Sequence, residues 1–79
     1  MRWYYKLLER GENFYIYAYS RESKNFDGRI RYDIDGGTPV MIEPSKADLD
    51  SKLSQKSALN HFWKVIKNDF PVECSVCCG

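Results

Sequence analysis

Three tyrosines alternate with apolar residues in the segment from Asn13 to Arg21. Tyr15, Tyr17 and Tyr19 share one face if this segment is a strand, because successive side chains of a strand point to opposite sides of the sheet. Their apolar neighbours are then expected to pack on a helix, which leaves the tyrosines open to solvent. With the cationic and aromatic residues of adjacent predicted strands, the predicted binding surface is Tyr4, Lys6, Tyr15, Tyr17, Tyr19, Arg29 and Arg31.

An open face of tyrosine, arginine and lysine suits two kinds of partner. Tyrosine and arginine are enriched at protein interfaces, which predicts another protein or a second copy of this chain as the partner. Aromatic rings also stack on unpaired bases while cations hold phosphate, so single-stranded nucleic acid is the alternative. The net charge of +1 favours protein, because nucleic-acid binders are usually basic. A third interpretation assigns no function, since tyrosine also suits the solvent side of an ordinary strand.

The three cysteines, Cys74, Cys77 and Cys78, fall near the C-terminus and include one C-x-x-C pair. A structural zinc site needs four ligands, and His61 is the one histidine in the chain. These four residues are the candidate metal ligands, but we expect neither a bound metal nor a cofactor. Residues 72–79 are predicted to be a flexible, cysteine-rich tail, whose thiols are a further candidate for function in a reducing compartment.

No group of residues in the sequence predicts catalysis. His61 has no nucleophile and no orienting acid at a spacing that would bring the three together. Asp33 and Asp35 resemble the start of a calcium loop, but Pro44 stands where a bidentate glutamate is needed, so a hairpin turn is predicted there. We expect that the protein is not an enzyme.

The length and composition indicate one small globular domain. The chain has 79 residues, of which 43% are hydrophobic and 15% aromatic, more than disordered segments carry. The first residues contain no apolar core of signal-peptide length, and the longest apolar run, from Phe14 to Tyr19, is too short to cross a membrane. We therefore expect a cytoplasmic protein with no membrane partner.

Four segments of the N-terminal half have the alternation and β-branched or aromatic content of strands. They are residues 2–8, 13–21, 29–34 and 38–43. Polar breaks of hairpin length separate them, which predicts a four-stranded antiparallel meander. The part of the core that the sheet contributes is predicted to be Trp3, Tyr5, Phe14, Ile16, Ile30, Tyr32, Val40 and Ile42.

The C-terminal half is predicted to be helical from about Ser45 onward. Ser45 and Asp48 have the spacing of a capping box. Leu49 and Leu53 are out of phase with the later apolar cluster, so we expect a bend or break near Ser54–Ser57. The sequence thus predicts an α+β domain over residues 1–71, with the helical segment packed on one face of the sheet.

Overall fold

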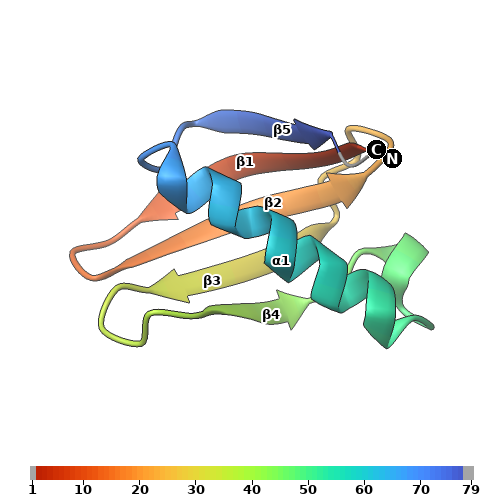
Figure 1. The fold of residues 1–79 in the computed structure, drawn as a ribbon, viewed down its shortest axis with the longest axis horizontal. Helices are drawn as coiled ribbons and strands as arrows, with labels where there is room; N and C mark the ends of the chain where they lie inside the picture. The colour runs from red at the N-terminus through yellow and green to blue at the C-terminus, as the bar shows by residue number, and fades with distance from the viewer. Residues whose placement is uncertain (1, 78–79) are drawn as a thin grey trace.

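The chain folds as a five-stranded antiparallel sheet with one long helix against one face (Figure 1). The computed structural model describes residues 2–77. The elements in chain order are β1 (Arg2–Arg10), β2 (Phe14–Arg21), β3 (Gly28–Asp33), β4 (Pro39–Glu43), the 3-10 helix η1 (Lys46–Asp48), α1 (Lys52–Lys67) and β5 (Glu73–Cys77). The strands lie side by side in the order β4-β3-β2-β1-β5. The predicted α+β class, with a meander followed by a helix, is confirmed, and one strand is added.

β5 is the strand that the sequence did not predict. Residues 73–77, assigned to a flexible tail above, pair with β1 along their whole length. The chain returns to the sheet through a tight reversal after α1, in which Asp69 and Phe70 have φ angles of 64° and 54°. An aromatic residue rarely adopts such a φ. The Phe70 ring stacks on Tyr15 with 3.8 Å between ring centroids, and this contact offsets the backbone strain.

The inner face of the sheet, which packs against α1, carries the tyrosines of β2. Tyr17 and Tyr19 are fully buried, whereas Phe14 and Ile16 lie on the opposite face. The register of β1 and β2 requires this arrangement, because Tyr19 pairs with the buried Tyr5 and directly paired residues share a face. The prediction that Phe14 and Ile16 face the helix was therefore wrong, because the two faces of β2 are exchanged.

β4 differs from the prediction in the same way. Met41 packs against the core because it pairs with the buried Ile30. Val40 and Ile42, predicted to be buried, are 55% and 52% exposed. The remaining predicted core residues of the sheet are confirmed as buried: Trp3, Tyr5, Ile30 and Tyr32.

The helical half is broken, but earlier than predicted. α1 runs without interruption through Ser54–Ser57, and the break lies at residues 49–51. Ser51 caps α1, because its hydroxyl accepts a hydrogen bond from a backbone N–H of the first turn. The predicted cap, Ser45, makes no such bond, since its hydroxyl donates to Asp27.

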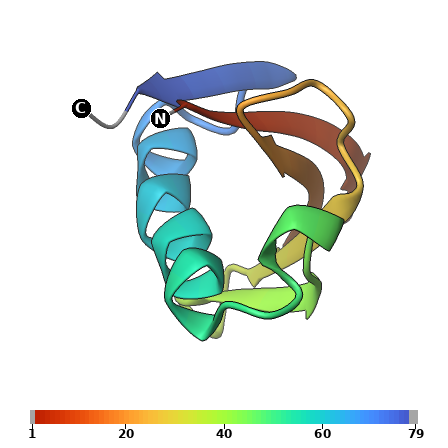
Figure 2. The same ribbon diagram turned by 90° about the vertical axis from the view of Figure 1, so that its right-hand side faces the viewer.

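α1 buries a narrow stripe of side chains against the tyrosine layer. Ala58, Phe62 and Val65 are fully buried. The Phe62 ring meets Tyr5 and Tyr17 edge-on, with ring centroids 5.5 and 5.2 Å apart. Seen along the strands, the sheet curves around α1, so the helix contacts both β4 and β5 at the two edges (Figure 2). The core is thus a layer of aromatic rings enclosed between the sheet and one helix.

Removal of residues 72–79 is expected to destabilise the domain. The truncation exposes the backbone edge of β1 and removes Val76, which is 3% exposed. We expect the free energy of unfolding to fall by about 3 kcal/mol or more, measured by urea denaturation. The exposed Cys77 provides the control, since Cys77→Ser should change stability by less than about 0.5 kcal/mol. A truncated chain as stable as the full chain would show that β5 contributes nothing.

Candidate functional site

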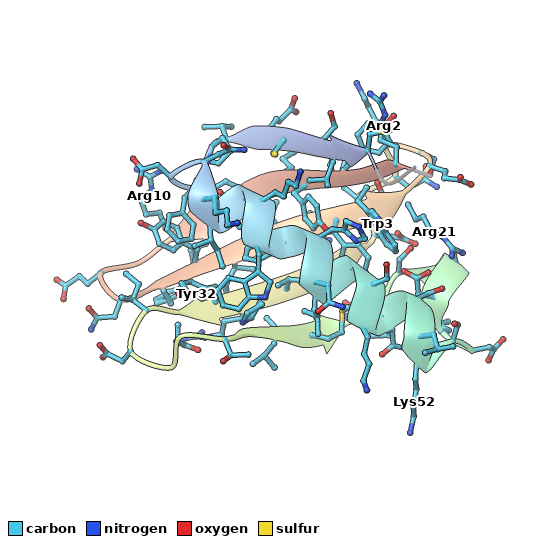
Figure 3. The ribbon with its side chains drawn as sticks, in the orientation of Figure 1. Arg2, Trp3, Arg10, Arg21, Tyr32 and Lys52 are labelled. Carbon is cyan, nitrogen blue, oxygen red and sulfur yellow. The ribbon has the colours of Figure 1, made fainter. Side chains whose placement is uncertain are left out.

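The outer face of the sheet, which is turned away from α1, carries the candidate site. The strand registers place these side chains on it: Tyr4, Lys6, Phe14, Ile16, Arg29, Arg31 and Val40. Lys6 and Val40 are exposed, and the other five are half-buried. In Figure 3 the buried Trp3 and Tyr32 lie between α1 and the sheet, on the other side from this face. A partner on the outer face therefore meets apolar and cationic groups together.

The predicted binding residues are divided between the two faces of the sheet. Four of them lie on the outer face: Tyr4, Lys6, Arg29 and Arg31. Tyr17 and Tyr19 are buried beneath the helical half, and Tyr15 is half-buried against Phe70. The prediction of an exposed tyrosine stripe was wrong, because these rings build the core.

The outer-face residues that sequence reasoning missed are Phe14, Ile16 and Val40. One sequence signal bears on the orientation of β2. Gly28 pairs with Tyr19, and a Cβ atom at Gly28 would overlap the Tyr19 ring. An aromatic ring that crosses a glycine on the neighbouring strand is a recurrent packing arrangement. Once the β2–β3 register is fixed, this pairing places the tyrosines on the inner face.

Arg31 is held in place over the apolar part of the outer face. Its guanidinium carbon lies 4.3 Å from the centroid of the Phe14 ring. Its Nη2 atom lies 3.0 Å from Oδ1 of Asp33. This hydrogen-bonded ion pair lowers the pKa of the Asp33 carboxyl and raises the pKa of Arg31. The guanidinium is thus oriented by an aromatic ring on one side and a carboxylate on the other.

The loop between β2 and β3, residues 22–27, lies against the part of the outer face that β1 forms. Arg29 fixes the loop by donating from Nη1 to the backbone oxygen of Phe26 at 2.7 Å. Lys6 Nζ lies 5.8 Å from the Phe26 ring centroid, and Lys24 Nζ lies 5.6 Å from the Tyr4 ring centroid. Each ammonium is therefore close enough for a cation–π interaction.

Two hollows flank Tyr4 under and beside this loop. The first has a volume of about 340 Å³, and its lining includes Arg2, Lys24, Phe26 and Glu73. The second has a volume of about 360 Å³, and its lining residues are Arg2, Tyr4, Glu22 and Cys77. Both hollows combine aromatic residues with charges of both signs, and Tyr4 lines both of them. They extend the outer face toward β5.

A buried polar network joins β2 to η1 on the inner side. The Tyr19 hydroxyl accepts from the Ser45 backbone N–H at 2.9 Å and donates to Asp48 Oδ2 at 3.1 Å. Oδ1 of the fully buried Asp48 lies 3.4 Å from Arg21 Nη2. Burial raises the pKa of the Tyr19 hydroxyl above its ordinary value. The Ser45 hydroxyl also donates to Oδ1 of Asp27, and this hydrogen bond lowers the pKa of the Asp27 carboxyl. The network therefore includes two carboxyl groups, those of Asp27 and Asp48.

The candidate metal ligands lie apart from one another. Cys74 is on the inner face of β5 and Cys77 on the outer face, and both are free thiols. The His61 Nδ1–H donates to a backbone oxygen one turn earlier at 2.7 Å, and the ring stacks on Trp3. Cys78 lies outside the described residues. Within residues 2–77, no three histidine, cysteine, aspartate or glutamate side chains gather in a way that could hold a metal ion.

Replacement of Tyr19 by phenylalanine is expected to lower stability by about 1–3 kcal/mol. The change leaves the buried Ser45 N–H without an acceptor and Oδ2 of Asp48 without a donor. Urea denaturation followed by circular dichroism measures the effect. Tyr15→Phe is the matched control, because it keeps the ring that stacks on Phe70, and it should change stability by less than about 0.5 kcal/mol. Equal stabilities of the two variants would contradict a role for the Tyr19 hydroxyl.

The buried tyrosine hydroxyls predict a loss of stability at high pH. Burial raises the pKa of Tyr17 to about 12, and it also raises the pKa of Tyr5 and Tyr19. An unfolded tyrosine titrates near pH 10, so above about pH 10 the unfolded chain releases protons that the folded chain retains. The free energy of unfolding, measured with urea, should therefore be unaffected by these groups at about pH 8 and fall as the pH rises through about 10 to 12.

Tyr17→Phe separates this titration from other alkaline effects. The variant lacks one of the protons retained by the fold, so its stability should fall less steeply with pH than that of the original chain. The comparison uses slopes, because the variant also loses the hydrogen bond from the Tyr17 hydroxyl to the Pro71 oxygen and starts from a lower stability. Identical slopes in the two proteins would exclude the proposed titration of Tyr17.

Comparisons with protein-family models, with curated proteins and with solved structures give no match for this chain. None of the helices formed by residues 2–77 has the length and apolarity needed to cross a membrane. Among the surfaces described above, the outer face is the one that combines accessible apolar groups with oriented cations.

Proposed function

We propose that this protein is a non-catalytic protein-binding module that uses the outer face of its sheet. The observation that carries the proposal is the presence of Phe14, Ile16 and Val40 on this face. An antiparallel sheet with one face in water normally alternates apolar residues inside with polar residues outside. Here both faces carry apolar side chains, and the accessible one also carries the arginine and tyrosine typical of protein interfaces.

The cations on the outer face indicate the chemistry of the partner. Lys6 is exposed on β1, and the Arg31 guanidinium lies over the Phe14 ring. A partner segment with an aliphatic or aromatic anchor and adjacent carboxylates would place its apolar group on Ile16 and Val40. Its carboxylates would then meet the Lys6 ammonium, while Arg31 stays paired with Asp33 beside the apolar groups. We therefore propose an acidic, partly apolar surface of another protein as the ligand.

Single-stranded nucleic acid is less favoured by the same geometry. The Arg31 guanidinium already bonds to Asp33, and Arg29 donates to the Phe26 and Gly28 carbonyl oxygens. Phosphate would have to compete with these internal acceptors. The net charge of +1 adds little long-range attraction for a polyanion.

A reducing compartment such as the cytoplasm is also part of the proposal. Cys74 and Cys77 are free thiols on opposite faces of one strand, so they cannot bridge to each other within β5. Disulfides are rare in compartments that keep thiols reduced.

Val40→Glu tests the proposed function. Val40 is 55% exposed on the outer face, so the charge should reduce partner affinity roughly tenfold or more while stability changes by less than about 0.5 kcal/mol. Leu53→Glu is the matched control, because Leu53 is 81% exposed on α1, away from the outer face. Affinity capture from cell extract uses the original chain, Val40→Glu and Leu53→Glu as baits. Candidate partners are the proteins that the original chain and Leu53→Glu capture and Val40→Glu does not. Calorimetry with the purified partner then measures the affinity.

Two outcomes would overturn this function. A partner that binds the Val40→Glu and original proteins with equal affinity cannot use the outer face as proposed. Titration with a short single-stranded oligonucleotide at low salt provides the second arm, since phosphate contacts are strongest there. Oligonucleotide binding that is lost with Phe14→Ser and kept with Leu53→Ser would assign the face to nucleic acid instead.

A further inference from the structure

The two edge strands of the sheet differ in how they are protected against pairing with another chain. β4 begins with Pro39, which has no N–H to donate, and its pairing with β3 is interrupted by a bulge between Arg29 and Ile30. β5 contains no proline, pairs with β1 in a continuous register and has Glu73 as its one charged residue. Proline, bulges and charges are the features that usually block the pairing of edge strands. β5 lacks proline and bulges, so it is the less protected of the two edges.

The hydrogen-bond pattern identifies the backbone groups of β5 that lack a partner. The Leu7 N–H donates to the Val72 oxygen, just before β5, at 2.8 Å. Antiparallel partners alternate between pairs that exchange hydrogen bonds and pairs that do not. The N–H and C=O groups of Glu73, Ser75 and Cys77 therefore point away from β1. No other element formed by residues 2–77 lies beyond them at this edge of the sheet (Figure 1).

We propose that a second copy of this chain pairs with β5 in antiparallel orientation, about a two-fold axis at Ser75. In this register Ser75 faces the partner's Ser75, and Glu73 faces the partner's Cys77. Every outward N–H and C=O of β5 then exchanges hydrogen bonds across the axis. A shift of two residues in either direction would leave Glu73 or Cys77 without a counterpart in the other β5. The axis is perpendicular to the sheet, so the two five-stranded sheets become one, with both helices on the same side.

The side chains on the outer face complement each other in this register. The partner's Glu73 lies beside Cys77, which pairs with Arg2 on β1. Neighbouring strands are about 4.8 Å apart, so the Cα atoms of Arg2 and the partner's Glu73 are about 10 Å apart, within reach of their side chains across the small cysteine. The hollow lined by Arg2, Tyr4, Glu22 and Cys77 opens at this point. In Figure 3 the Arg2 side chain projects past the end of β5.

The side chains at the two-fold axis and on the inner face of β5 also fit this register. Serine at the axis brings no like charges together, and Cys74 lies beside the partner's Val76, which extends the apolar layer. The contact is only five residues long on each chain, so we expect a weak dimer with a dissociation constant on the order of 100 µM. The dimer does not depend on the proposed function, because Val40 and the other apolar residues of the outer face lie on strands away from β5.

Sedimentation velocity of the full chain under reducing conditions tests the dimer. Between about 10 µM and 1 mM, the original chain should pass from monomer to dimer. Ser75→Pro removes the outward N–H without removing a β1–β5 hydrogen bond, so this variant should stay monomeric over the whole range. Ser75→Ala keeps the N–H and should dimerise like the original chain.

Two further variants keep the test decisive if proline disturbs the fold. Ser75→Glu leaves the backbone unchanged and places two carboxylates across the axis, which should weaken the dimer about tenfold or more, and most strongly at low salt. A chain in which all three cysteines are replaced by serine and Ser75 by cysteine tests the register. On oxidation it should form a disulfide-linked dimer, because the two positions 75 face each other within disulfide distance.

The proposal is overturned if the original chain remains monomeric at about 1 mM, or if its dimer persists unchanged in both Ser75→Pro and Ser75→Glu. Absence of the position-75 disulfide in an otherwise dimeric protein would also overturn it, because the register would then be wrong. Val40→Glu should dimerise normally. A failure of the dimer can therefore be told apart from a failure of the proposed binding function, which Val40→Glu addresses.

Discussion

The hydroxyl groups of three buried tyrosines determine what can pack on the inner face of the sheet. Each hydroxyl donates to a different segment: Tyr5 to Ala58 in α1 at 2.7 Å, Tyr17 to Pro71 before β5 at 2.7 Å, and Tyr19 to Asp48 in η1 at 3.1 Å. A buried hydroxyl without a partner costs about 1–3 kcal/mol. α1, η1 and the connection to β5 are therefore tied to the sheet at fixed points, and none can shift without leaving a hydroxyl unpaired.

This constraint explains why the sequence predicted the strands and the helix but chose the wrong face of β2. Local alternation and turn residues are enough to predict hairpins and a helix. The orientation of β2 is different, because both of its faces are apolar, and hydropathy favours burying Phe14 and Ile16 rather than tyrosine. Tyr17 can be buried without an unpaired hydroxyl because the Pro71 oxygen, 54 residues away, accepts its hydrogen bond. No local pattern contains that acceptor.

β5 and the position of the helix break depend on tertiary context in the same way. Residues 73–77 include a single strongly buried side chain, Val76, and become a strand because β1 offers a free edge beside them. The phase difference of Leu49 and Leu53 predicted a break near Ser54–Ser57, which is wrong, because α1 runs unbroken from Leu53 into the later apolar cluster. The argument assumed that both leucines pack on the sheet, whereas both are exposed, and the helical half is interrupted at residues 49–51 instead. Ser51, one of several serines able to cap, sets the start of α1.

The inversion of β2 also accounts for the outer face. With tyrosines filling the inner positions, Phe14 and Ile16 must point outward, and a single long helix can cover only one side of a sheet. The Arg31 side chain shields Phe14 in part, since long cationic side chains cover apolar surface with their stems while their charged groups remain in water. A partner that displaces this water gains apolar contact without having to bury an unpaired charge, because Asp33 already accompanies Arg31. The fold thus leaves apolar groups uncovered on the outer face and backbone hydrogen-bonding groups unpaired along the edge strand β5. Because one surface is a face of the sheet and the other is its edge, a partner on one does not block a partner on the other.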